Sequence, residues 1–137
     1  MATVLVVEDN PANMKLTSLL LHSAGHNVLP AVDAETALRL AHDEQPDLIL
    51  MDIQLPGMDG LVATAILKED PATAHIPIVA LSALAMKADE ERSQTAGCDA
   101  YIVKPVRYKE LYAVMERLLK EPQPPAGRAT SPDLPPT

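Results

Sequence analysis

The stretch LILMDIQLPGMDG, from Leu48 to Gly60, decides which fold to expect. Four apolar residues lead into a carboxylate, Asp52, and a loop containing Pro56 and two glycines follows. A short apolar run bounded by turn residues is typical of a strand buried on both faces in a parallel sheet. Open α/β sheets bind their ligands at the carboxyl ends of such strands. Asp52 is therefore either a functional residue or only the cap of the loop that follows it.

Four further apolar runs alternate with segments of helical periodicity on both sides of this stretch. This alternation predicts an α/β fold with a doubly wound, five-stranded parallel sheet in the flavodoxin-like order 2-1-3-4-5 and five helices. The expected strands are Thr3–Val7, Asn27–Ala31, Leu48–Asp52, Ile76–Leu81 and Ala100–Val103. The expected helices run from Pro11 toward Gly25, from Asp33 to Ala41, and over Gly60–Lys68, Met86–Ala96 and Tyr108–Leu119.

Local signals support several of these elements. Asn10 can cap the first helix, and Pro11 suits its first position because that backbone N–H has no partner within the helix. Met14, Leu16, Leu19, Leu20 and Ala24 then recur at helical spacing. Asp33 can cap the second helix. Pro30 cannot donate to a strand ladder, so the second strand is expected at an edge of the sheet.

Composition favours proteins or cations as partners. The 137 residues carry a formal charge of −8, whereas binding a nucleic-acid backbone relies on clustered Lys and Arg. Cys98 is the only cysteine, so no internal disulfide can form, and we expect it to serve packing. Neither a charged-then-apolar leader nor a long apolar span is present, which predicts a cytoplasmic protein without a membrane segment.

The last 17 residues, EPQPPAGRATSPDLPPT, differ from the rest of the chain. They include six prolines and few residues that could build a core, so ordering them would cost more free energy than burial returns. We expect one domain over residues 1–120 (137 − 17 = 120) and a flexible Pro-rich tail over residues 121–137. A spacer is favoured over a polyproline ligand because no PxxP with a flanking basic residue stands out.

Polar residues lie at or just after the ends of four expected strands. Glu8 and Asp9 follow the first strand, Asp52 ends the third, Ser82 follows the fourth and Lys104 follows the fifth. The carboxyl ends of parallel strands share one edge of a sheet, so these side chains are expected together. The strand order reverses between the first and third strands, and Asp9 and Asp52 should flank the crevice at that point.

Three carboxylates in one crevice require a cation. Each close pair costs roughly 4 kcal/mol at ~4 Å and an effective dielectric constant of ~20. Oxygen ligands without His or Cys favour Mg²⁺ over zinc. Such an ion would hold a phosphoryl group against Asp9 or Asp52, and aspartyl carboxylates are known phosphoryl acceptors. Lys104 and Ser82 could contact phosphoryl oxygens, although singly they would be read as a solvated lysine and a strand-end hydroxyl.

Four motifs carry a family resemblance. VVEDN at Val6–Asn10, LILMDIQLPGMDG, ALSA at Ala80–Ala83 and AGCDAYIVKP at Ala96–Pro105 resemble the receiver domain of two-component response regulators. The resemblance covers Thr3 to Leu119. The run His75–Lys87 and then DEERSQTAGCDAYIVKP at Asp89–Pro105 are also similar to the DivK-type single-domain receivers of bacterial cell-cycle control.

This resemblance implies a phosphorylation site. Asp52 would be the phosphoacceptor, and Lys104 would contact the phosphoryl group. Mg²⁺ would be bound by Asp9, Asp52 and the backbone carbonyl of Gln54. Glu8 replaces the Asp often found at its position in the family, so it is expected to reach the ion through water.

The resemblance also implies a conformational switch. Ser82 would be drawn toward the phosphoryl group, and Tyr101 would turn into the space it leaves. A cis peptide bond between Lys104 and Pro105 is a further family feature. The switch would change the face formed by the fourth helix, fifth strand and fifth helix, which would then contact a downstream protein or a second copy of the chain.

The expected phosphodonor is a sensor histidine kinase or a histidine phosphotransfer protein, and catalysis would be limited to self-phosphorylation and self-dephosphorylation. A phosphatase of the haloacid dehalogenase type would need an acid two residues after the nucleophile, where this chain has Gln54. A nucleotide- or flavin-binding module would need a glycine-rich first loop in place of residues 8–11. A receiver excised from a larger hybrid kinase, with the tail as linker, remains an alternative.

Overall fold

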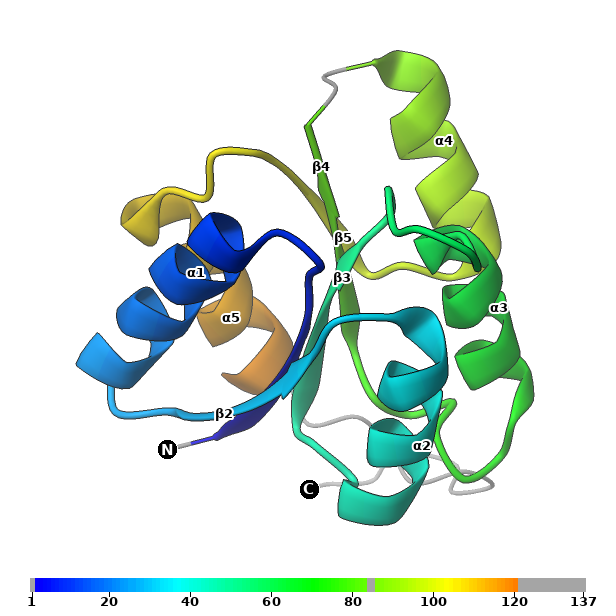
Figure 1. Ribbon diagram of the computed structural model, residues 1–137, viewed down its shortest axis with the longest axis horizontal. Helices are drawn as coiled ribbons and strands as arrows, with labels where there is room; N and C mark the ends of the chain where they lie inside the picture. Colours follow the sequence, from blue (N-terminus) through cyan, green and yellow to red (C-terminus); the bar gives the residue numbers. More distant parts are fainter. Residues whose placement is uncertain (1, 84–85, 121–137) are drawn as a thin grey trace, which may run out of the picture.

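A five-stranded parallel sheet forms the centre of the computed structural model, which describes residues 2–83 and 86–120 (Figure 1). The strand order is β2-β1-β3-β4-β5, and every neighbouring pair is parallel. The predicted fold class and strand order are confirmed, whereas the prediction of a flexible tail concerns residues outside the described part. The strands are β1 Thr3–Val7, β2 Asn27–Ala31, β3 Leu48–Asp52, β4 Ile78–Ser82 and β5 Ala100–Val103.

Helices cover both faces of the sheet (Figure 1). The helices α1 and α5 lie on one face, and α2, α3 and α4 lie on the other. None of the described helices is both long and apolar enough to cross a bilayer. The helices are α1 Pro11–Ser23, α2 Ala34–Glu44, α3 Gly60–Glu69, α4 Lys87–Ala96 and α5 Tyr108–Lys120.

Side-chain caps are observed at two of the predicted helix starts. The side chain of Asn10 accepts a hydrogen bond from the Asn13 N–H at 3.0 Å, and that of Asp33 accepts one from the Thr36 N–H at 2.8 Å. Strand β4 begins two residues later than expected, at Ile78, after a proline that has no N–H to donate to the ladder. Pro30 lies in β2, an edge strand, as predicted.

The apolar residues of α1 do not all face the core. Thr17 and Leu21 are buried, whereas Leu16 is 37% exposed and Leu19 is 60% exposed. A helix packed on a sheet buries only one stripe of its surface, and α1 carries more leucines than that stripe can hold. Helical spacing alone therefore did not identify the buried residues of α1.

Strand β3 lies in the middle of the sheet, between β1 and β4. Its side chains are buried on both faces: Leu48 and Leu50 belong to the core beneath α1 and α5, and Ile49 and Met51 to the core beneath α2 and α3. Asp52 ends this apolar strand and is only 2% exposed. The fold therefore places one carboxylate at the centre of the sheet's carboxyl edge.

Gly60 allows α3 to begin directly against the end of β3. A Cβ atom on Gly60 would overlap the carbonyl oxygen of Asp52 and lie 2.8 Å from the Cα of Ile53. These are backbone atoms, so they cannot move aside as a flexible side chain could. The close approach fixes the start of α3 relative to Asp52.

We expect Gly60→Ala to lower the free energy of unfolding by about 2 kcal/mol, the usual scale for forcing an atom into a packed site. Gly25→Ala is the control, because no atom lies within 4 Å of its Cβ position and only the φ of +86° opposes the substitution. That strain should cost roughly 1 kcal/mol. Urea denaturation measures both losses, and a Gly60 loss no larger than the Gly25 loss would contradict the steric explanation.

Candidate functional site

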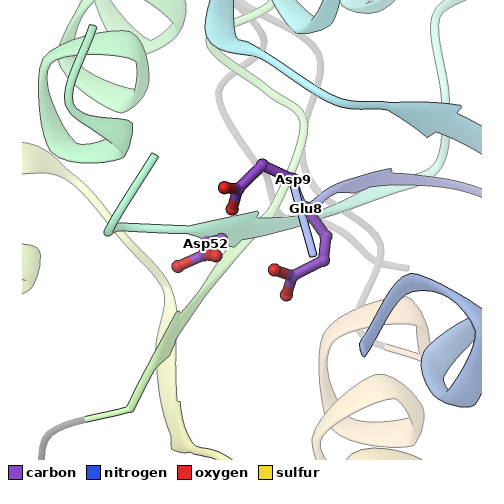
Figure 2. A group of neighbouring side chains, drawn as sticks. All are labelled: Glu8, Asp9 and Asp52. Carbon is purple, nitrogen blue, oxygen red and sulfur yellow. The ribbon is translucent and has the colours of Figure 1, made fainter. Parts of the chain in front are cut away.

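Three carboxylates converge at the carboxyl edge of the sheet (Figure 2). Glu8 and Asp9 follow β1, and Asp52 ends the neighbouring strand β3. Each offers an oxygen atom, and these oxygens all lie within 4.8 Å of one another. Glu8 and Asp52 are buried, whereas Asp9 is exposed at the rim of the cluster. The structure thus brings together the three acids that the sequence placed at this edge.

Lys104 bridges two of these acids. Its Nζ lies 2.8 Å from Oε1 of Glu8 and 2.9 Å from Oδ2 of Asp52. The lysine side chain is 13% exposed, so both ion pairs are largely removed from water. Lys104 therefore compensates part of the repulsion that the sequence predicted for this cluster.

Burial and the neighbouring charged groups together shift the pKa values of Glu8 and Lys104. Burial raises the pKa of Glu8, and the nearby Asp52 raises it further, although the hydrogen bond from Lys104 opposes the shift. Burial alone would lower the pKa of Lys104, but its hydrogen bonds to Glu8 and Asp52 outweigh that effect and raise it. The lysine thus stays protonated, while Glu8 is the carboxylate whose charge is costly to keep.

The remaining carboxylate oxygens accept backbone hydrogen bonds. Oε2 of Glu8 accepts from the N–H of Asn10 at 3.2 Å, and Oδ1 of Asp52 accepts from the N–H of Gln54 at 2.9 Å. Both oxygens of Glu8 and both oxygens of Asp52 therefore already have a protein donor. This arrangement fixes the orientation of the two buried carboxylates.

Ser82 and Tyr101 occupy the two strands beyond Asp52. Ser82 ends β4 and is fully buried. Tyr101 lies on β5 opposite Ala80 and packs, partly buried, against a small cluster that includes Ile53 and Leu61. Ser82 and Tyr101 are thus adjacent to the site, one on each of two paired strands.

The loop after β5 is tied to the end of β4. The N–H of Lys104 donates to the carbonyl oxygen of Ser82 at 2.7 Å. The peptide bond between Lys104 and Pro105 is cis. The backbone contact positions the start of the lysine side chain at the same edge as the acids.

The side chain of Gln54 makes a contact that sequence reasoning missed. Its Oε1 accepts a hydrogen bond from the N–H of Ala83 at 3.1 Å. From the sequence, only the backbone carbonyl of Gln54 was expected to matter. The single available signal was an amide side chain two residues after Asp52, and that signal does not specify a partner.

The donor set fits a hard cation such as Mg²⁺. The cluster offers carboxylate oxygens only, and no His or Cys joins it within residues 2–83 and 86–120. Both oxygens of Glu8 and both oxygens of Asp52 already accept protein hydrogen bonds, so the exposed Asp9 is the most accessible ligand, and a bound ion would share the Asp52 carboxylate with Lys104 or Gln54. Mg²⁺ typically uses one or two carboxylates and keeps several waters, which suits this set.

We expect Lys104→Met to lower the free energy of unfolding at pH 7 by roughly 1 to 3 kcal/mol, because two buried carboxylates lose their cation. The loss should shrink in acid. The folded pKa of Glu8 lies above its ordinary value of 4.5, and without Lys104 it should rise further. The contribution of Glu8 to the free energy of unfolding is therefore present below about pH 4.5, and it is lost as the pH rises through the pKa of Glu8 in the folded protein.

Urea denaturation in EDTA at about pH 4 and pH 7 measures this difference. In a Glu8→Gln background, Lys104→Met should cost much less at pH 7, and its loss should depend less on pH. An equal loss at both pH values in the single variant would show that Lys104 does not compensate a titrating carboxylate.

Comparison with known proteins agrees with this geometry. The family model for the response regulator receiver domain matches residues 4–116. The polar-differentiation response regulator DivK of Brucella anthropi is 49% identical over 104 residues, which cover 76% of this chain and 85% of that protein. DivK of Brucella ovis shows the same identity and coverage.

Solved structures give the same result. The receiver domain of the sensor histidine kinase PA1611 from Pseudomonas aeruginosa, solved with a magnesium ion coordinated in its active-site cleft, has a TM-score of 0.82 and 35% identity, covering 88% of this chain and 98% of that one. A CheY-like receiver domain protein from Methanospirillum hungatei has a TM-score of 0.81 and 28% identity, covering 88% and 95%. The chain therefore belongs to the response regulator receiver domain family of two-component signalling.

Proposed function

We propose that Asp52 accepts a phosphoryl group from a phosphohistidine on a sensor histidine kinase or a histidine phosphotransfer protein. The observation that carries this proposal is the placement of Asp52: a buried carboxylate at the sheet's carboxyl edge, 2.9 Å from the Lys104 ammonium and within the cluster of three acids. A carboxylate oxygen would attack phosphorus while the P–N bond to the imidazole breaks, and the bonding electron pair would stay on the nitrogen.

Residues of this chain would supply the electrostatic stabilisation. Lys104, already beside Asp52, would neutralise charge on the transferring group without a large rearrangement. Asp9, Asp52 and the backbone carbonyl of Gln54 would hold Mg²⁺, which when bound would balance the remaining negative charge. Glu8, whose oxygens accept from Lys104 and Asn10, would act on the ion through water.

Ser82 and Tyr101 would convert this event into a change of surface. Ser82, buried at the end of β4, would bring its hydroxyl toward the phosphoryl oxygens. Tyr101 is half-buried against Ile53 and Leu61, and it would turn further inward into the space that Ser82 leaves. The readout would be an altered α4-β5-α5 face, and the change would be a local electrostatic event with a distant consequence.

The output of this face would be contact with a downstream protein or formation of a homodimer. The net charge of −8 supports a protein partner over nucleic acid. We place the protein in the cytoplasm, where its phosphodonors would act, and its receiver domain over residues 1–120. Its own chemistry would be limited to phosphorylation and dephosphorylation of Asp52.

We expect Asp52→Asn to abolish phosphorylation, because an amide is not a nucleophile. Intact-protein mass spectrometry after incubation with acetyl phosphate and Mg²⁺ should show one added phosphoryl group on the wild type and none on the variant. Asp47→Asn is the matched control, since Asp47 precedes the same strand at the opposite edge of the sheet and is exposed. Full labelling of Asp52→Asn would assign the acceptor to another residue.

The same variants test the metal. At a hundredfold excess over its dissociation constant, Mg²⁺ should stabilise the wild type by about 2.7 kcal/mol relative to EDTA. Asp52→Asn should gain much less, and Asp47→Asn as much as the wild type. An equal gain in Asp52→Asn would remove Asp52 from the metal site.

A further inference from the structure

Gln54 connects the loop after β3 to the end of β4. Its backbone N–H donates to Oδ1 of Asp52 at 2.9 Å, and its side-chain oxygen accepts from the N–H of Ala83 at 3.1 Å. A backbone N–H can only donate, so the amide atom facing Ala83 must be the oxygen. One residue therefore contacts both the acceptor carboxylate and the backbone next to Ser82.

The register of the sheet brings these two loops together. Asp52 pairs with Leu81 across β3 and β4, and the N–H of Ile53 donates to the carbonyl of Leu81 at 3.0 Å. Ala83 therefore lies just beyond the strand end that adjoins the residues following Asp52. Its N–H is directed at Gln54, beside the carboxylate.

A phosphoryl group on Asp52 would enter this same space. It carries three strong acceptor oxygens, and backbone N–H groups at the ends of secondary-structure elements are common phosphate donors. In the unphosphorylated chain, the donor of Ala83 is already occupied by the neutral amide oxygen of Gln54. A charged phosphoryl oxygen is the stronger acceptor and would win that donor.

We propose that Gln54 is a placeholder for the phosphoryl group: its side chain holds the Ala83 N–H until phosphorylation, and then releases it to a phosphoryl oxygen. Gln54 and Ala83 are both exposed, so the released amide can turn into solvent without breaking any packing. The exchange would remove the hydrogen bond between Gln54 and the residue after Ser82 at the moment Ser82 is needed. This inference rests on the proposed phosphorylation of Asp52, and it makes Gln54 a positioning residue.

Two substitutions separate the acceptor oxygen from the length of the side chain. Gln54→Met keeps a similar length but has no comparable acceptor, and Gln54→Glu keeps an acceptor oxygen but adds a negative charge. Gln94→Met is the matched control, because Gln94 is an exposed glutamine on α4. Two measurements apply: hydrogen exchange of the Ala83 amide without ligand, and affinity for beryllofluoride, a phosphoryl mimic, in the presence of Mg²⁺.

In Gln54→Met, the Ala83 amide should exchange about fivefold faster, and beryllofluoride should bind about fivefold more tightly because no internal acceptor competes. Gln54→Glu should restore slow exchange and weaken beryllofluoride binding. Gln94→Met should match the wild type in both measurements. If Gln54→Met only loosened the protein in general, the Ala83 amide would exchange faster but beryllofluoride would not bind more tightly.

Unchanged Ala83 exchange in Gln54→Met would overturn the inference, since no hydrogen bond would have been lost. Weaker beryllofluoride binding by that variant would also overturn it, because Gln54 would then be a ligand of the phosphoryl group. In both cases the wild type still binds the mimic, so the proposed function stands. Failure of the wild type itself to bind beryllofluoride would instead overturn the proposed function, and the inference with it.

Discussion

The ion pairs of Lys104 with Glu8 and Asp52 hold the functional edge of the sheet together. Lys104 follows the edge strand β5, yet its Nζ reaches acids that follow β1 and end β3. To do so the side chain crosses the end of β4, where its own N–H is anchored on the carbonyl of Ser82. Lys104 thus links four strand ends, because its side chain reaches those of β1 and β3, its backbone is tied to the end of β4, and it directly follows β5.

The elements that the sequence predicted correctly have local causes. The run of Leu48 to Met51 had to be buried on both faces, and its central place in the sheet follows from that. Side-chain caps at Asn10 and Asp33 mark helix starts within three residues of themselves. The buried stripe of α1 was less predictable, because leucines recur all around that helix and only packing against the sheet selects Leu21 over Leu19. The local sequence pattern was sufficient to predict an element only where a single packing arrangement could satisfy that pattern.

The site was predictable in its membership but not in its contacts. Parallel strands with polar ends bring Glu8, Asp9 and Asp52 to one edge whatever the side-chain details. Which acid pairs with Lys104 depends on reach, and glutamate is one methylene longer than aspartate. That length lets Glu8 meet the lysine while its other oxygen accepts from Asn10. The contact between Gln54 and Ala83 joins residues 29 positions apart, and no periodicity specifies such a pair.

The charge balance of the cluster supports its proposed role as a switch. Three carboxylates and one ammonium group carry a net charge of −2 (−3 + 1), which a divalent cation would cancel. A phosphoryl group on Asp52 would replace one carboxylate charge by nearly two, and the Lys104 ammonium, 2.9 Å from Oδ2 of Asp52, lies beside it. Any movement of Lys104 toward that group would weaken its bond to Glu8, a buried carboxylate whose pKa is raised by burial. The lysine cannot serve both anions equally, so the proposed phosphorylation would redistribute contacts at the strand ends that it links.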